Sequence, residues 1–215
     1  MIKEISKDDF VVEVTKTKEK SVRVKAEKGL NFPNNHFVFT ELNEKDKNDI
    51  AFACEHADII GCSFVNEGRD IKLIQNEMRQ ILGDNTNKVS LMAKIETVRA
   101  VRNLPEIIFT AASINPFSIM IARGDLAAES GYIDLAGLQQ EIMWISEAGD
   151  IPVVWATEVL DTLISEGIPT RSEVTDAAEG TRADCVMLNK GDYIVEGVRM
   201  LNRIIERMEP IQYKK

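Results

Sequence analysis

The amino-acid sequence predicts an α/β fold built around a parallel β-sheet. Five continuous apolar runs alternate with segments of helical periodicity along most of the chain. Runs that are apolar throughout are typical of strands covered on both faces, as in a parallel sheet. Strict alternation of strands and helices occurs in closed barrels and in open, doubly wound sheets, and the pattern by itself leaves both open.

Each expected strand is an apolar run that ends close to polar residues. The five are ADIIGCSFV, KVSLMAKIE, FSIMIARGD, IPVVWATEV and DCVMLN. The expected helices place apolar residues on one face; they are TELNEKDKNDIAFACEH, with Thr40 as its N-cap, and the ranges 68–82, 98–109, 135–147, 173–181 and 193–208.

The N-terminal part has a different rhythm. Residues 10–25 alternate loosely between apolar and polar, which predicts a hairpin or two short strands, with the charged stretch 16–20 at the turn. The breaker-rich KGLNFPNN that follows indicates a domain boundary. We therefore expect a small β segment over residues 1–30 and an α/β domain over residues 31–215.

Composition excludes several classes of protein. The 215 residues are 44% apolar, which permits a substantial core, and the net charge of −9 comes without a basic patch, so nucleic acid is not an expected partner. Three cysteines, an odd number at no metal-binding spacing, indicate a reducing compartment. With no signal-like N-terminus and no apolar run of about 20 residues, the expectation is a cytoplasmic protein without a membrane partner.

The stretch LMAKIET carries the first chemical signal. Lys94 and Glu96 are two residues apart on an expected strand, so both point to the same face. A carboxylate there can hold Mg²⁺, and an ammonium beside it can neutralise a developing oxyanion. A plain Lys–Glu surface pair is the alternative that the spacing leaves open.

The next strand, in IMIARGDLA, repeats this arrangement. Arg123 and Asp125 are again expected to share a face, with Gly124 between them permitting close approach of the backbone. The residues that follow look like the start of a helical turn, whose amides suit a carboxylate or phosphate. Glu96 and Asp125 could then be paired oxygen ligands of one Mg²⁺, while an Arg–Asp salt bridge at the strand end is the alternative.

Several of these motifs resemble the pyruvate kinase family. The segments LMAKIET, IARGDL, WATEVLDTL and PTRSEVTDAAEGTRADCVML occur in the family's order, preceded by KGLNFPN and DIIGCSFV, so the resemblance runs from about Val11 to Met208. It implies a (β/α)8 barrel of the TIM type, of which this chain holds about five βα units. It also implies that residues 1–30 are the end of a small β lid domain.

The resemblance also implies a role for each site residue. Lys94 would stabilise the enolate of pyruvate, and Glu96 and Asp125 would bind Mg²⁺ (or Mn²⁺). The amides of Gly124 and Asp125 would hold the carboxylate of phosphoenolpyruvate, and Thr157 would line the route that protonates the enolate. The remaining residues implied to contact the substrate are Ser63, Phe64 and Arg123.

The implied reaction is phosphoryl transfer from phosphoenolpyruvate to ADP, giving pyruvate and ATP in glycolysis. Relative to the family pattern, the first three barrel strands are missing, with their arginine, part of the nucleotide site and the ligands of a possible K⁺. A Gly-Glu-Thr loop is replaced by KGDYIVEGV, and no C-terminal regulatory domain follows. Thr97 stands where asparagine is common, and Arg99 where an acidic or polar residue is usual.

These departures leave three hypotheses open. The chain could be a pyruvate-kinase-like phosphotransferase that is inactive alone, acting as a homo-oligomer or together with the missing half of the barrel. It could be a Mg²⁺-dependent carbon–carbon lyase acting through a pyruvate enolate, although ARGD and PTRSEV favour the kinase. It could also be a non-catalytic assembly module derived from the kinase.

Overall fold

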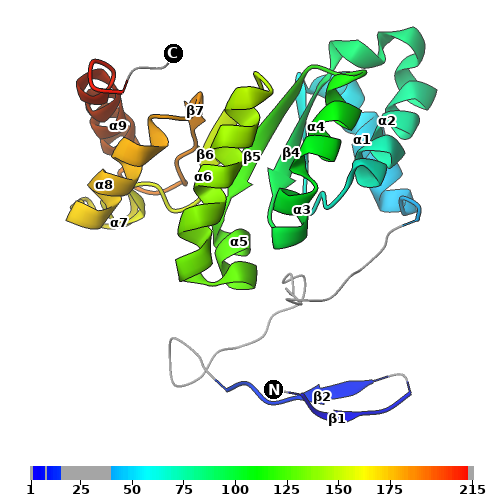
Figure 1. Cartoon of the computed structure of the whole chain (residues 1–215), viewed down its shortest axis with the longest axis horizontal. Coiled ribbons are helices and arrows are strands. Elements are labelled where there is room, and N and C mark those ends of the chain that lie inside the picture. Colours follow the sequence, from blue (N-terminus) through cyan, green and yellow to red (C-terminus); the bar gives the residue numbers. More distant parts are fainter. Residues whose placement is uncertain (1, 8, 16–39, 213–215) are drawn as a thin grey trace. The chain divides into compact units, whose positions relative to one another are not determined.

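The computed structural model describes residues 2–7, 9–15 and 40–212 (Figure 1). The chain divides into two compact units, Met1–Asn31 and Phe32–Lys215. Among the helices of the described residues, none is both long enough and apolar enough to cross a lipid bilayer.

The first unit contains an antiparallel hairpin of β1 (Ile2–Ile5) and β2 (Phe10–Val12). Ser6 closes its turn, because the Ser6 amide donates to the Asp9 carbonyl at 2.8 Å and the Asp9 amide donates to Ser6 Oγ at 3.2 Å. Strand β2 falls at the start of residues 10–25, where strands were expected, whereas β1 and the turn lie before that range. Serine and aspartate are residues that favour such a turn. The expected turn at 16–20 lies outside the described residues.

The second unit contains a five-stranded parallel sheet. Its strands are β3 (Ile59–Cys62), β4 (Ser90–Ile95), β5 (Phe117–Ala122), β6 (Val153–Ala156) and β7 (Cys185–Val186). They lie side by side in chain order, β3-β4-β5-β6-β7. A doubly wound sheet reverses its strand order at a switch point, whereas each strand of a barrel lies beside the next one in sequence. The topology is therefore that of a barrel, with five of its units present.

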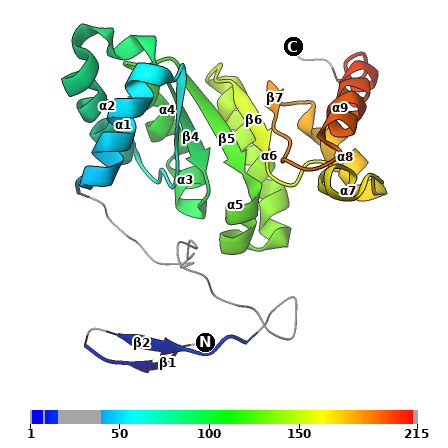
Figure 2. The ribbon, with the colours of Figure 1, turned by 180° about the vertical axis from the view of Figure 1, so that it is seen from behind.

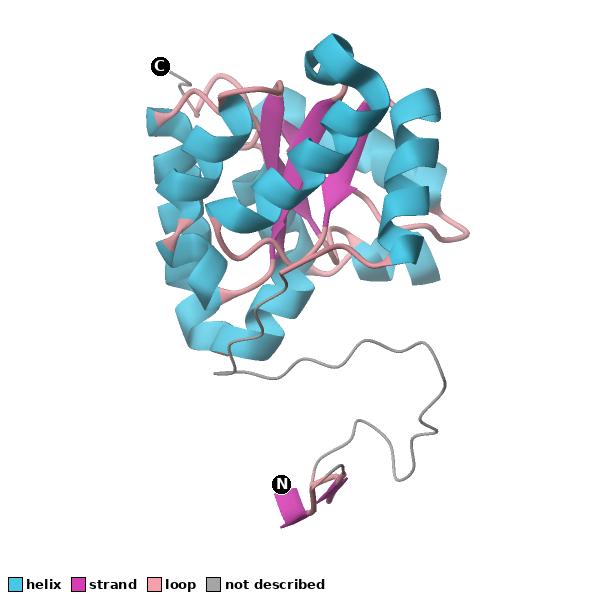
Figure 3. Ribbon diagram, turned by 90° about the vertical axis from the view of Figure 1, so that its right-hand side faces the viewer, coloured by secondary structure: helices cyan, strands magenta, loops and turns pink. Residues whose placement is uncertain are grey.

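Helix α1 (Glu44–His56) precedes the sheet, and helices follow each of its strands. These are α2 (Gly68–Leu82), α3 (Val98–Arg102), α4 (Leu104–Ala112), α5 (Arg123–Ser130), α6 (Tyr132–Ala148), α7 (Asp161–Glu166), α8 (Arg171–Gly180) and α9 (Ile194–Met208), with a 3₁₀ helix η1 at Gly83–Lys88. Figure 3, turned so that the α1–α2 side faces the viewer, shows the strands with helices packed around them.

Local chemistry explains where two helices differ from the sequence prediction. Thr40 is not an N-cap, because Asn43 accepts from the Asp46 amide at 2.8 Å and the Asp46 carboxylate accepts from the Asn43 amide, which completes a capping box. The helix expected over 98–109 is broken into α3 and α4, since Pro105 lacks an amide proton and is tolerated only in a first turn.

The two faces of the sheet differ in how they are covered. Leu91, Ala93 and Ile95 are fully buried, whereas the alternate residues of β4, Met92 and Lys94 among them, are only partly buried. Helices α4 and α6 cross the buried face of β4 and β5 in Figure 1, and Figure 2 shows the same strands from behind. Lys94 therefore projects from the face that the helices leave open.

Trp155 of β6 connects the sheet to α8 at close range. The ring is almost fully buried, and a Cβ added to Gly180 would lie 2.7 Å from its Cδ1 atom. Contacts below 3.0 Å require a shift, and a rigid indole packed in the core has little room to move. The absence of a side chain at Gly180 is thus a packing requirement.

We expect Gly180→Ala to lower the free energy of unfolding by about 1–3 kcal/mol, because it overpacks the contact with Trp155. Gly137→Ala is the matched control, since Gly137 lies within α6 and nothing would lie within 4 Å of its added Cβ. The control should be neutral or stabilising by up to about 1 kcal/mol, because alanine is the better helix former. Urea unfolding followed by circular dichroism measures both, and equal stability of the two variants would contradict this packing account.

Candidate active site

The end of β4 gathers four of the residues singled out from the sequence. Lys94 is the penultimate residue of β4 and Glu96 follows the strand directly. Lys94 Nζ lies 2.8 Å from Glu96 Oε1 and donates to Ser63 Oγ at 3.0 Å. The other carboxylate oxygen, Glu96 Oε2, accepts from the amide of Phe64. The loops after β3 and β4 thus meet around one carboxylate.

Burial distinguishes this arrangement from a surface ion pair. The Glu96 side chain is only 1% exposed, while that of Lys94 is 29% exposed. A buried carboxylate is costly unless it is paired and hydrogen-bonded, and here one oxygen has an ammonium and the other a backbone donor. Because a carboxylate offers about four lone-pair positions, Glu96 can still accept a further cation. Lys94 and Glu96 therefore do not form the exposed surface pair that the sequence left open as an alternative.

The neighbouring Cys62 is not a nucleophile candidate. It precedes Ser63 and is buried, and this burial raises the pKa of its thiol to about 12. Reactivity requires the thiolate, which is scarce at neutral pH for a thiol with so high a pKa.

Backbone strain is concentrated in the loops after β3 and β6. Of the five described non-glycine residues with positive φ, four lie in these loops: Phe64 at 52°, Thr157 at 69°, Glu158 at 56° and Leu160 at 51°. A residue held in this region costs on the order of 1–3 kcal/mol and persists only when its surroundings over-determine it. Strain of this kind is typical of functional loops.

The loop after β5 departs from the sequence prediction. Strand β5 ends at Ala122 and helix α5 begins at Arg123, so the alternation expected to place Arg123 and Asp125 on one face of a strand does not apply. Asp125 lies instead in the first turn of α5. The Gly124 amide donates to Thr157 Oγ1 at 3.0 Å, which joins the loops after β5 and β6.

Arg123 is turned toward β6 and α8. Its guanidinium donates to the carbonyls of Ala156, at 2.8 Å, and Thr157, and it pairs with both carboxylate oxygens of Asp176. It also stacks over the Trp155 ring, with Cζ 4.7 Å from the centroid. With 11% of its side chain exposed, Arg123 fixes the strained Thr157 loop. The ion pair is thus made with Asp176 in α8, where the alternative from sequence paired Arg123 with Asp125.

The register of the sheet places the Lys94–Glu96 pair and the Arg123–Thr157 contact at the same edge of the sheet. The β4–β5 ladder pairs Lys94 with Met120 and Ile95 with Ile121, so the loops that follow leave neighbouring strands at a similar level. Beyond them, the Val98 amide at the start of α3 donates to the Glu129 carboxylate of α5 at 2.9 Å. The segments that follow β3, β4, β5 and β6 are therefore linked one to the next at the carboxyl ends of the strands, where barrel enzymes have their active sites.

The donor set fits a hard divalent cation held by few protein ligands. Within the described part of the chain, no three histidine, cysteine, aspartate or glutamate side chains form a metal-binding group. Mg²⁺ usually keeps several waters and takes only one or two carboxylates, with substrate oxygens completing its shell. The buried, oriented Glu96 and the nearby first turn of α5 with Asp125 are compatible with that mode.

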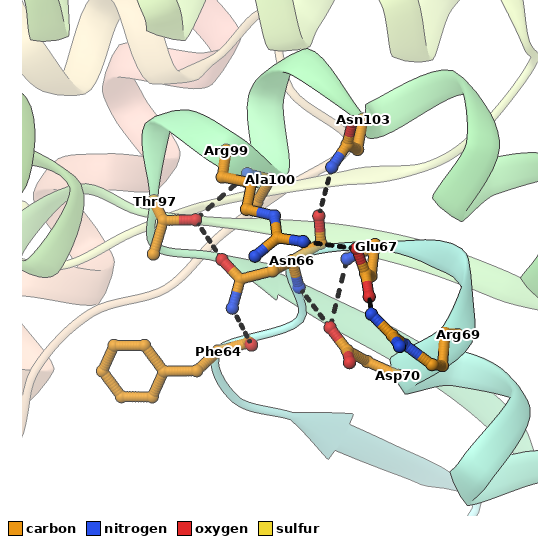
Figure 4. A network of polar contacts seen from close by, with 9 residues as sticks. All are labelled: Phe64, Asn66, Glu67, Arg69, Asp70, Thr97, Arg99, Ala100 and Asn103. Atoms are coloured by element: carbon orange, nitrogen blue, oxygen red, sulfur yellow. Dashed lines mark hydrogen bonds and ion pairs between the residues drawn. The ribbon is translucent and has the colours of Figure 1, made fainter. Parts of the chain in front are cut away.

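Several residues of the site were missed from the sequence. Asp176 lies within PTRSEVTD, where an acid in a quoted motif could have signalled a partner for Arg123. Figure 4 shows a second set, a network that joins the loop after β3 to α3. Its members include Asn66, Glu67 and Asn103, together with Thr97 and Arg99, for which the sequence predicted no contact. No local pattern identifies this set, because its contacts span about 30 residues of sequence.

Fold and site together define a barrel-type α/β protein with a lysine and a buried carboxylate paired at the carboxyl end of one strand, β4. Residues 1–198 match the family model described as pyruvate kinase, barrel domain. The chain belongs to the pyruvate kinase family. This confirms the resemblance drawn from its motifs and the barrel-type fold.

Curated relatives support the assignment over most of the chain. It is 36% identical to a pyruvate kinase of Agrobacterium vitis over 85% of this chain and 37% of that protein. It is 32% identical to a pyruvate kinase of Encephalitozoon cuniculi over 93% of this chain and 45% of that protein. It is 31% identical to a pyruvate kinase of Hypocrea jecorina over 91% of this chain and 36% of that protein. The chain thus spans less than half the length of these relatives.

We expect Arg123→Lys to lower the free energy of unfolding by about 1.5–3 kcal/mol, since an ammonium cannot reproduce the bidentate pair with Asp176 or the stacking on Trp155. Arg199→Lys is the matched control, because Arg199 is an exposed residue of α9. The control should change stability by less than about 0.5 kcal/mol. Equal losses in urea unfolding would show that Arg123 contributes no more than a surface arginine.

Proposed function

We propose that this chain provides the enolate-stabilising and metal-binding part of a pyruvate kinase active site. The reaction is transfer of the phosphoryl group from phosphoenolpyruvate to ADP, giving pyruvate and ATP. The observation that supports this most strongly is the buried Glu96, held by Lys94 and by the Phe64 amide at the mouth of β4.

Lys94 is suited to stabilise the enolate. As the phosphoryl group leaves the enol oxygen, negative charge develops on that oxygen, and a preorganised cation lowers the barrier because it needs no reorientation. An ammonium has three donors, and the contacts with Glu96 and Ser63 use two of them. Held from two sides, Lys94 can direct its remaining donor to the substrate from the open face of the sheet.

Thr157 is suited to handle the proton that converts enolate to pyruvate. Its Oγ1 accepts from the Gly124 amide, which fixes the oxygen and leaves the hydroxyl proton to point toward the substrate. Arg123 donates to the Thr157 carbonyl in the strained loop. We therefore propose that the main role of Arg123 at the site is to position Thr157. Ser63 and Phe64 border the substrate through their contacts with Lys94 and Glu96.

The cation would be Mg²⁺ or Mn²⁺, held by Glu96 and Asp125. When bound, it would supply positive charge that chelates the carboxylate and phosphoryl oxygens of the substrate. The chain's contribution is to keep the Glu96 carboxylate buried and oriented after β4, and to carry Asp125 in the first turn of α5, which follows the neighbouring strand β5. Family membership favours this reaction over the carbon–carbon lyase considered from the sequence.

We further propose that the remaining strands of the barrel pair with the exposed edge of β3. A groove of about 600 Å³ runs between α1, α2 and β3, and Ile59 at this edge is 51% exposed. Its floor is mainly apolar, and its rim carries the acidic residues Glu41, Asp46, Asp49 and Asp70. Since five strands cannot close an eight-stranded barrel, the polypeptide that corresponds to the first part of the relatives is the partner expected here.

The metal assignment predicts metal-dependent binding of oxalate, which has the charge and shape of the pyruvate enolate. Oxalate should bind the 215-residue chain only when Mn²⁺ is present, and the double variant Glu96→Gln, Asp125→Asn should lose that binding. Glu106→Gln, an exposed carboxylate on α4, is the control and should bind as the parent does. Calorimetry that shows equal Mn²⁺-dependent binding by parent and double variant would eliminate this metal site.

Because the sheet holds five of the eight strands of a barrel, we also make a prediction for the activity of the isolated chain. We expect little or no pyruvate kinase turnover from the 215 residues alone, because the arginine and the part of the nucleotide site that the family resemblance assigns to the first three barrel strands are not among them. Adding a polypeptide with the missing strands should raise pyruvate formation in a coupled assay. Robust ADP-dependent turnover by a monodisperse monomer would contradict this expectation, and absence of both turnover and oxalate binding in the reconstituted protein would favour the non-catalytic assembly module.

A further inference from the structure

The loop after β3, residues Ser63–Glu67, supplies both the hydroxyl that accepts from Lys94 and the amide that donates to Glu96. We call this segment the β3 loop. Its Phe64 has a φ of 52°, a conformation that a non-glycine residue adopts only when other contacts hold it. The contacts that hold the β3 loop therefore determine where the Glu96 carboxylate finds its backbone donor.

Asn66 is the centre of these contacts (Figure 4). Its side-chain amide donates to the Phe64 carbonyl at 2.8 Å, and its side-chain oxygen accepts from the Thr97 hydroxyl. The Asn66 carbonyl accepts from Asn103 Nδ2 at 2.9 Å, and the Asn66 amide donates to Asp70 at 2.8 Å. One asparagine thus connects the strained Phe64 peptide to α2, to α3 and to the residue that follows Glu96.

An ion pair makes a second connection between the same segments. The Arg99 guanidinium of α3 pairs with Glu67, whose side chain is 17% exposed, and Arg69 pairs with the same carboxylate from α2. The hydrogen bond from Arg69 and, against the opposing effect of burial, the charge of Arg99 hold the pKa of Glu67 below its usual value. Of these two ion pairs, the one with Arg99 joins the β3 loop to the segment after β4. The one with Arg69 is local, because Arg69 and Glu67 are two residues apart in the chain.

We propose that Asn66, Thr97 and the Glu67–Arg99 ion pair are positioning residues that set the metal affinity of Glu96 through the Phe64 amide. This inference rests on the proposed metal site and extends it to residues that do not touch the metal. Outer-shell partners that orient a ligating carboxylate typically contribute 10–100-fold to metal affinity.

Two charge reversals separate positioning from simple electrostatics. Arg99→Glu and Arg69→Glu change the net charge by the same amount and remove a partner from the same carboxylate, but only Arg99→Glu breaks the connection between the two loops. If charge acted through space alone, both reversals would leave Mn²⁺ affinity unchanged or raise it. The positioning role predicts that Arg99→Glu weakens Mn²⁺ binding by about 10-fold or more, whereas Arg69→Glu does not weaken it.

Two further variants complete the experiment. Glu67→Arg combined with Arg99→Glu reverses the ion pair and should restore Mn²⁺ affinity to within about threefold of the parent, since the two changes are coupled. Asn66→Ala removes two side-chain hydrogen bonds without adding charge, and should weaken Mn²⁺ binding while leaving the circular dichroism spectrum of the chain unchanged. Calorimetry with MnCl₂ on the 215-residue chain gives the affinities.

Hydrogen–deuterium exchange provides a readout that is independent of metal. Peptides containing Phe64 should exchange faster in Arg99→Glu and Asn66→Ala than in the parent, and at the parent rate in Arg69→Glu. If the parent fails to bind Mn²⁺ while this exchange pattern holds, the proposed metal site is wrong and the positioning of the β3 loop stands. Equal exchange in the two arginine reversals would overturn the positioning role, as would faster exchange in Arg99→Glu with undiminished Mn²⁺ affinity.

Discussion

The structure of the site depends on one buried carboxylate. Glu96 is almost completely enclosed, and an enclosed carboxylate is stable only where donors meet it from fixed directions. Lys94 supplies one donor from the same strand, and the Phe64 amide supplies the other from the loop after β3. The buried carboxylate at the end of β4 therefore depends on the neighbouring βα unit for one of its donors.

This requirement explains why backbone strain is found where it is. The Phe64 amide donates to Glu96 from a residue with φ at 52°, and the Asn66 network and the Glu67–Arg99 pair hold the β3 loop in that conformation. The loop after β6 is held in a similar way. Arg123 donates to the carbonyl of the strained Thr157, and Arg123 is itself fixed by its ion pair with Asp176 and its stacking on Trp155. In both loops, charged side chains with several fixed partners maintain a backbone that would relax in isolation.

Strand β3, at the edge of the sheet, is less well covered than the strands in its centre. Inside the unit, β4 and β5 are paired on both sides, and their helix-covered residues are fully buried. At β3 the ladder of described strands stops beside an apolar groove, and such an edge favours pairing with another strand. The positions of Lys94 and Glu96 are thus fixed by β3 and β5, while β3 pairs on one side only among the described strands.

The sequence by itself determined the α/β class, the five strands, the range of α2 and the residues at the strand mouths, because periodicity, apolar runs and turn chemistry act over a few neighbouring residues. It also identified the family through the order of its motifs. Barrel topology was decided by strand order, since an alternating pattern suits two architectures. Only the tertiary structure could show that Arg123 begins a helix and pairs with Asp176, 53 residues away, or that Asn66 and Arg99 support the Phe64 amide. Those contacts join residues that are distant in the chain, and their partners are set by the packing of whole βα units, which no local pattern encodes.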